Sequence, residues 1–168
     1  MFSTITARTV AAVCALALGL LTGCANAPPA KVTPSGKAEV TIAGVEPDAI
    51  RSAVTGYMLD ISVPGRDRYT IESDSPMRLV FVRPLEGNEN LGASIAIGNS
   101  SSSNYRVISF SFVRVDSGVR VIADNKWRAV MPLGKVNETD LNTGPVVDYY
   151  QGALEAIQAR LEAPRAVK

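Results

Sequence analysis

The chain has 168 residues, of which 20% are charged and 46% hydrophobic, with 13 Gly, 10 Pro, two Cys and no His. This composition is that of one globular domain, and it excludes a membrane channel, a collagen, a disulfide-dense miniprotein and a wholly disordered chain. Seventeen basic and 16 acidic residues leave a net charge of +1, which favours no nucleic-acid partner. Without histidine, the chain lacks the usual general base near neutral pH and the commonest zinc ligand.

The N-terminus has the pattern of a targeting signal. A single basic residue, Arg8, precedes a twelve-residue apolar run from Val10 to Leu21. A membrane-spanning helix needs about 20 apolar residues, whereas a signal peptide needs about 7 to 15 after a positively charged start. We therefore expect residues 1–23 to be a signal peptide. Two alternatives stay open: an uncleaved single-span anchor, and an apolar helix that ends in a buried, unmodified cysteine.

The apolar run ends in Leu21-Thr22-Gly23-Cys24, which resembles the lipobox of bacterial lipoproteins: an aliphatic residue, two small residues and a cysteine. In that family the cysteine thiol receives a diacylglyceryl group, a signal peptidase cuts before the cysteine, and the new amino group can be acylated. The resemblance implies that Leu21, Thr22 and Gly23 are recognised by the peptidase and that Cys24 becomes the lipidated first residue. Apart from this covalent lipid, no cofactor is expected.

The residue after the cysteine bears on location. It is Ala25, not the Asp that retains such lipoproteins in the inner membrane of many Gram-negative bacteria. The resemblance therefore implies an outer-membrane anchor with the domain facing the periplasm. In a Gram-positive source it implies the outer face of the cell membrane. Because Cys14 lies within the signal peptide, the processed chain keeps one cysteine and can form no intramolecular disulfide.

A tether separates this anchor from the domain. Residues 24–37 contain three prolines and Gly36 but no apolar periodicity, so we expect the lipidated cysteine to be followed by a flexible linker. Residues 38–164 then form a single domain.

Two segments of the domain have the pattern of amphipathic helices. The first begins at Pro47 and ends between Met58 and Ser62, and the second begins near Pro145 and ends before Pro164. Each carries one apolar stripe at helical spacing. The stripes consist of Ile50, Ala53, Val54, Tyr57 and Ile61 in the first helix, and of Val146, Tyr150, Leu154, Ile157 and Leu161 in the second.

The remaining segments alternate with the period of β-strands, and Asp116-Ser117-Gly118 is a compact hairpin signal. The expected strands are Val40–Ile42, Tyr69–Glu72, Met77–Val82, Ala93–Ile97, Tyr105–Val115 and Val119–Val130.

These elements predict an α+β domain. We expect an antiparallel sheet of five to six strands with two helices on one face, in the order β-α-β-β-β-β-β-α. This order is similar to the helix-grip architecture of START-like lipid-binding domains and of some accessory lipoproteins of outer-membrane protein assembly. The similarity concerns the fold and implies no function by itself.

No catalytic set is evident. A metal site is not expected without histidine, without a free cysteine and with acidic residues that are mostly scattered. Neither an SxxK nor a GxSxG pattern occurs, so we name no catalytic residue and expect no enzyme. Paired carboxylates for glycoside cleavage stay open, since only their separation in space decides that chemistry.

Trp127, the single tryptophan, is followed by Arg128, and two interpretations of this pair are open. An exposed Trp127 with Arg128 would form a partner surface, because aromatic and arginine side chains dominate such contacts. Alternation with Ala129 instead places Trp127 on the core face, which we favour.

The leading functional hypothesis is a non-enzymatic accessory or binding domain, anchored to the membrane by lipid, that contacts another envelope protein. The alternative is a carrier of a lipid or a small apolar ligand, with a cavity between helix and sheet. The two differ in whether the interior is filled by large side chains. The expected filling residues are Tyr57, Phe81, Phe110, Phe112 and Leu154.

Overall fold

The computed structural model describes residues 33–61, 68–97 and 103–163. The predicted signal peptide, the lipobox with Cys24 and most of the predicted tether lie outside these ranges. Within them, no helix combines the length and apolar character needed to cross a membrane.

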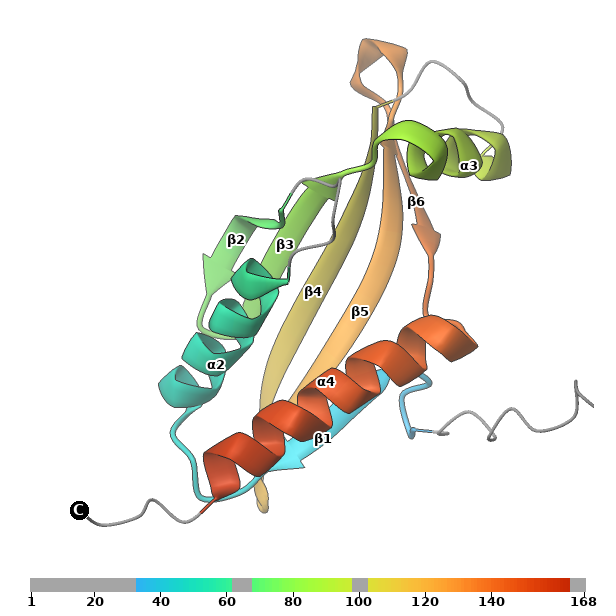
Figure 1. Ribbon diagram of the computed structural model, residues 1–168. Coiled ribbons are helices and arrows are strands. Elements are labelled where there is room, and N and C mark those ends of the chain that lie inside the picture. Colours follow the sequence, from blue (N-terminus) through green and yellow to red (C-terminus); the bar gives the residue numbers. More distant parts are fainter. Residues whose placement is uncertain (1–32, 62–67, 98–102, 164–168) are drawn as a thin grey trace, which may run out of the picture.

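The domain is one curved antiparallel sheet with three helices on one side (Figure 1). The strand order is β1-β5-β4-β3-β2, and β6 also pairs with β5. The strands are β1 (Ala38–Ile42), β2 (Thr70–Ser75), β3 (Arg78–Pro84), β4 (Ser103–Val115), β5 (Gly118–Val130) and β6 (Val136–Asp140). The helices are α2 (Pro47–Asp60), α3 (Gly87–Ile97) and α4 (Gly144–Glu162), with a short 3-10 turn at Pro132–Gly134.

The predicted α+β class is confirmed, but the predicted number of helices and order of elements are wrong. The observed order is β-α-β-β-α-β-β-β-α. A third helix, α3, replaces the strand expected over Ala93–Ile97, and β6 was not expected at all.

Polar contacts explain why α3 is a helix despite its alternating sequence. Ala93 and Ser94 are both buried while Ile95 is 73% exposed, which is the burial of a helix and not of a strand. The buried side of α3 attaches to the sheet mainly through hydrogen bonds. Asn104 of β4 donates to Asn90 at 2.7 Å and to Ser94 at 2.9 Å.

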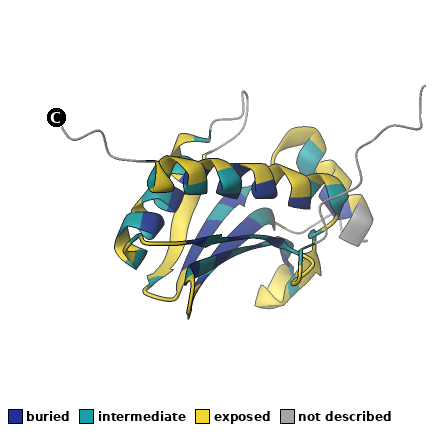
Figure 2. Cartoon of the chain, turned by 90° about the horizontal axis from the view of Figure 1, so that it is seen from below, coloured by how far each residue is buried: buried dark blue, intermediate teal, exposed yellow. Residues whose placement is uncertain are grey.

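The hydrophobic core lies between the sheet and helices α2 and α4. Alternate residues of β1, β3, β4 and β5 point to this side, which we call the inner face. Figure 2 shows that buried residues line the space between the sheet and the helices. The largest fully buried core side chains include Phe81, Phe110, Ile42, Ile50, Met58, Leu79, Ile108 and Leu154.

Helix α4 also covers the free edge of β1. Gln151 donates to the carbonyl oxygen of Glu39 at 3.1 Å and accepts from the Glu39 N–H at 2.8 Å. About two turns further, Gln158 donates to the carbonyl oxygen of Thr41 at 2.9 Å. These bonds satisfy an edge that would otherwise be open to another strand.

The opposite, outer face of the sheet is covered by long charged side chains. Lys126 pairs with Glu138 at 2.9 Å, and Arg78 donates to Ser109 at 3.1 Å. Beneath them Val107 and Ser109 are buried, because long charged side chains can shield apolar surface while their ends stay in water.

Gly118 generates a stability prediction. It opens β5 with φ +140°, and an added Cβ would overlap the backbone carbonyl of Ile42. We expect Gly118→Ala to lower the free energy of unfolding by roughly 3 kcal/mol, from backbone strain and steric overlap together. Gly56 is the matched control, since it lies in α2 with open space around it. Gly56→Ala should raise stability by about 1 kcal/mol. Urea denaturation of both variants measures the two changes in the free energy of unfolding. Equal effects would contradict the claim that position 118 requires glycine.

Candidate functional site

The site begins with a gap along one edge of β5. The first half of this edge pairs with β1, ending at Ala123, and the second half pairs with β6, starting at Lys126. Asp124 and Asn125 lie between and have no strand partner on that side. Buried backbone groups require hydrogen-bond partners, so another part of the chain must supply them.

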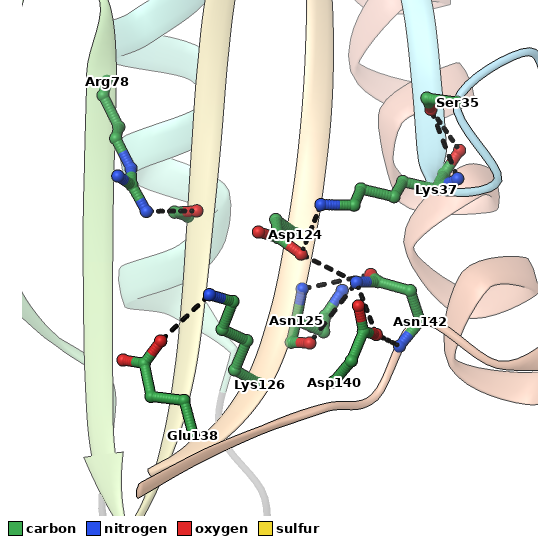
Figure 3. A network of polar contacts seen from close by, with 10 residues as sticks. Ser35, Lys37, Arg78, Asp124, Asn125, Lys126, Glu138, Asp140 and Asn142 are labelled. Atoms are coloured by element: carbon green, nitrogen blue, oxygen red, sulfur yellow. Dashed lines mark hydrogen bonds and ion pairs between the residues drawn. The ribbon is translucent and has the colours of Figure 1, made fainter. Parts of the chain in front are cut away.

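Asn142 fills this gap (Figure 3). Its side-chain oxygen accepts from the Asn125 N–H at 3.1 Å, and its side-chain nitrogen donates to Asp124 at 2.7 Å and to Asp140 at 2.9 Å. The Asn125 carbonyl oxygen accepts from the N–H of Leu141 at 3.0 Å. Asn142 therefore takes the place of a strand residue between β1 and β6.

Asp124 ties the start of the domain to the same point. Lys37 pairs with its carboxylate at 2.8 Å. Burial alone would raise the pKa of Asp124, but the bonds from Lys37 and Asn142 outweigh it, and the pKa lies below its ordinary value. The carboxylate therefore remains charged and holds both partners near neutral pH.

Asn142 fixes the start of α4. The first turn of this helix forms one wall of a pocket. Helix α4 begins at Gly144, two residues after Asn142, and its first turn brings Pro145 and Val146 towards the inner face. The pocket has a volume of about 270 Å³ and is open to solvent. We call it the Tyr–Arg pocket. It is lined by Ile61, Tyr69, Arg83, Glu89, Arg106, Pro145, Val146, Tyr149 and Tyr150.

An ion pair forms the α3 side of the pocket. Arg83 donates through both terminal nitrogens to Glu89, each at 2.9 Å, and its guanidinium lies 5.5 Å from the centre of the Tyr69 ring. Arg83 is 5% exposed. The Glu89 carboxylate raises the pKa of Arg83 above its ordinary value, so this arginine stays charged. A two-bond pair at this burial is a rigid attachment between β3 and α3.

Three tyrosines also line the pocket. Tyr69 and Tyr150 are buried, whereas Tyr149 is 53% exposed at the rim. The rings of Tyr149 and Tyr150 meet edge to face with centroids 4.9 Å apart. Burial raises the pKa of Tyr150, and the neighbouring Tyr69 hydroxyl raises it further. The Tyr150 hydroxyl is therefore protonated at neutral pH.

Arg106 supplies the second positive charge. It is half-buried and forms no ion pair or hydrogen bond with the described part of the chain. Trp127 lies directly across the β4–β5 pair from Arg106, and Asn125 lies two pairs further along, opposite Ile108. The side chain of Asn125 is fully buried, and neither of its polar atoms has a partner among the described residues.

A second depression, of about 590 Å³, runs between α2 and α4. Small residues lie along it, with Tyr57 on one side. Burial raises the pKa of Tyr57, and its hydroxyl lies 3.5 Å from that of Tyr149. This groove borders the Tyr–Arg pocket where these two tyrosines meet. Its lining comprises Ser52, Ala53, Gly56, Tyr57, Asp60, Ala156, Ile157, Arg160 and Leu161.

The structure does not bring the two predicted surface residues together. Trp127 points to the inner face opposite Arg106, is half-buried, and has an indole nitrogen without a partner in the described ranges. Arg128 points to the outer face, where it pairs with Glu72 and, at 3.1 Å, with Glu138. The lipidation residues, Leu21 to Cys24, lie outside the described residues.

Sequence reasoning missed the residues of the Tyr–Arg pocket, although a signal for two of them was present. Arg83 continues the inward alternation of Leu79 and Phe81, and Arg106 precedes Ile108 and Phe110 in the same phase. A charged residue in phase with core positions indicates a polar site at that end of the sheet. Glu89 gave no such signal, because it lies before the strand expected over Ala93–Ile97 and its segment was not expected to be helical.

Comparisons with family models, curated proteins and solved structures find no match for this chain. Across residues 33–61, 68–97 and 103–163, no three His, Cys, Asp or Glu residues gather closely enough to hold a metal ion.

Proposed function

We propose that this chain is a lipid-anchored lipoprotein of the bacterial cell envelope whose α+β domain is a non-enzymatic binding module. The Tyr–Arg pocket carries the binding part of the proposal, because charged, hydroxyl and apolar groups from four elements and from the ends of two connecting segments converge on it. The lipobox-like sequence ending in Cys24 supports the anchor, and Ala25 supports an outer-membrane location with the domain facing the periplasm.

The ionisable groups of the pocket favour binding over catalysis. A general acid or base works best when its pKa lies near the working pH. The pKa of Tyr150 is instead raised by burial, and the pKa of Arg83 is raised by Glu89. These groups keep fixed protonation states near neutrality, which suits the holding of a ligand.

The apolar carrier gains less support. Four of the five expected filling residues are buried in the core: Phe81, Phe110, Phe112 and Leu154. Tyr57, the fifth, is half-buried and lines the groove between α2 and α4. The space between the helices and the sheet therefore holds side chains, and the pocket at its end is partly polar. The helix-grip likeness stays a proposal about the fold, supported by α4 lying along β1 on one side of the sheet.

The anchor is tested by Cys24→Ser in the native host. We expect the wild-type chain to incorporate labelled palmitate and to begin at residue 24, because the thiol is the site of lipid attachment. The variant should remain an unlabelled, unprocessed precursor. Mass spectrometry of both proteins gives the first residue and the attached mass. A processed chain that begins elsewhere, or that carries no lipid, would overturn the anchor.

The binding module is tested by photo-crosslinking in cells. A photoreactive amino acid at Tyr149, on the rim of the pocket, should form adducts with a component of the envelope. Leu133 is the control position, since it is fully exposed on the turn before β6 and lies outside the pocket. Adducts specific to position 149 support the proposal. No adduct at 149, or the same products at both positions, would count against it.

A further inference from the structure

The Tyr–Arg pocket contains one positive charge that no other residue in the described part of the chain neutralises. Three charged side chains line it: Arg83, Glu89 and Arg106. Arg83 and Glu89 pair with each other through two hydrogen bonds of 2.9 Å. Arg106 has no ion pair within the described part of the chain, so the lining that the structure describes carries a net charge of +1. A half-buried guanidinium attracts an anion more strongly than an exposed one, because water screens it less.

Hydroxyl groups and a helix terminus lie near this charge. Tyr69 and Tyr150 bring two phenolic hydroxyls that bond each other, which leaves one hydroxyl hydrogen to donate to an anion. Pro145 and Val146 come from the first turn of α4, so the positive end of this helix lies beside the pocket. Helix dipoles favour negative charge at this end. These features reinforce Arg106.

The remainder of the lining is apolar and the volume is small. Ile61, Val146 and the Tyr149 ring provide hydrocarbon surface beside the charged groups. A volume of about 270 Å³ lies just below the usual range of drug-sized clefts, roughly 300–1,000 Å³. The pocket therefore suits one small group that is charged at one end and apolar at the other.

The charge count distinguishes between anions. A phosphate group carries about −1.5 to −2 near neutral pH, which exceeds the single unpaired positive charge and would meet the nearby Glu89 carboxylate. A carboxylate carries one charge, and its two oxygens match the planar fork of an arginine. Monovalent carboxylates thus fit the pocket better than phosphates.

We propose that the Tyr–Arg pocket binds a carboxylate attached to a small apolar or aromatic group, with Arg106 as the residue that pairs with it. The inference rests on the proposed binding function and names its ligand class. Two sources share this chemistry: a free aromatic or aliphatic acid, and the C-terminal residue of a peptide chain.

The test compares acids with matched neutral and phosphate probes. The full chain in detergent is titrated with phenylacetate, N-acetylphenylalanine, N-acetylphenylalaninamide and inorganic phosphate. Trp127 lies directly across the strand pair from Arg106 and is the single tryptophan, so its fluorescence reports occupancy. We expect at least one acid to bind about tenfold more tightly than the amide and than phosphate. Binding of phenylacetate supports a free acid as the source, and binding of N-acetylphenylalanine alone supports a peptide C-terminus.

Variants assign the effect to Arg106. Arg106→Gln should weaken the acid about tenfold and leave the weak binding of the amide unchanged, because only the charge pair is lost. Arg114→Gln is the matched control, since Arg114 is exposed on the same strand outside the pocket. Circular dichroism establishes that both variants fold.

Three outcomes overturn the proposal: no binding of either acid, equal binding of acid and amide, or equal loss in both variants. Tighter binding of phosphate overturns the choice of carboxylate. If the acids fail while crosslinks at Tyr149 persist, the carboxylate inference falls and the binding function stands. If both fail, the binding function falls with it.

Discussion

The structure depends on how the edge of β5 is shared between two strands. β1 and β6 arrive from opposite ends of the chain and pair with different halves of this edge, which leaves Asp124 and Asn125 without a strand partner. Unpaired backbone groups in a folded interior are costly. Asn142 satisfies the Asn125 N–H with its side chain, and the N–H of Leu141 satisfies the Asn125 carbonyl. The chain can then leave the sheet and begin α4 within two residues.

This arrangement links the sheet edge to the candidate site. The first turn of α4 forms one wall of the Tyr–Arg pocket, and later turns bond to the β1 edge through Gln151 and Gln158. Helix α3 closes the opposite side through the Arg83–Glu89 pair. The pocket thus lies where the large apolar core ends and polar attachments begin. Apolar packing sets the position of α2 and α4, while hydrogen bonds and one ion pair set the position of α3.

The sequence was informative where burial follows a simple period. Alternation predicted the long β4–β5 hairpin with its turn at Asp116 and Ser117, and the apolar stripes predicted α2 and α4. Even there both predicted stripes were incomplete, since Met58 of α2 and Gln151 of α4 are buried as well. The C-terminal stripe nevertheless included Tyr150, a residue of the pocket.

The parts that sequence reasoning missed are held by polar contacts with distant residues. β6 has almost no apolar pattern and forms through backbone pairing with β5 and the ion pairs of Glu138. Helix α3 alternates like a strand but bonds to Asn104 and Arg83, which no local pattern reveals. The pocket was not predicted for the same reason. Its two arginines come together as one site only when β3, β4 and α3 are placed next to one another.

The most direct test of this account is residue-resolved hydrogen exchange of the Asn142→Ala variant by NMR. Loss of the Asn142 side chain should speed exchange of the Asn125 amide, and also of the Val146 and Val147 amides that open α4. Amides shared between β3 and β4, such as that of Phe110, should keep their protection. Unchanged exchange at Asn125 and in the first turn of α4 would contradict the claim that Asn142 joins the divided sheet edge to the helix and its pocket.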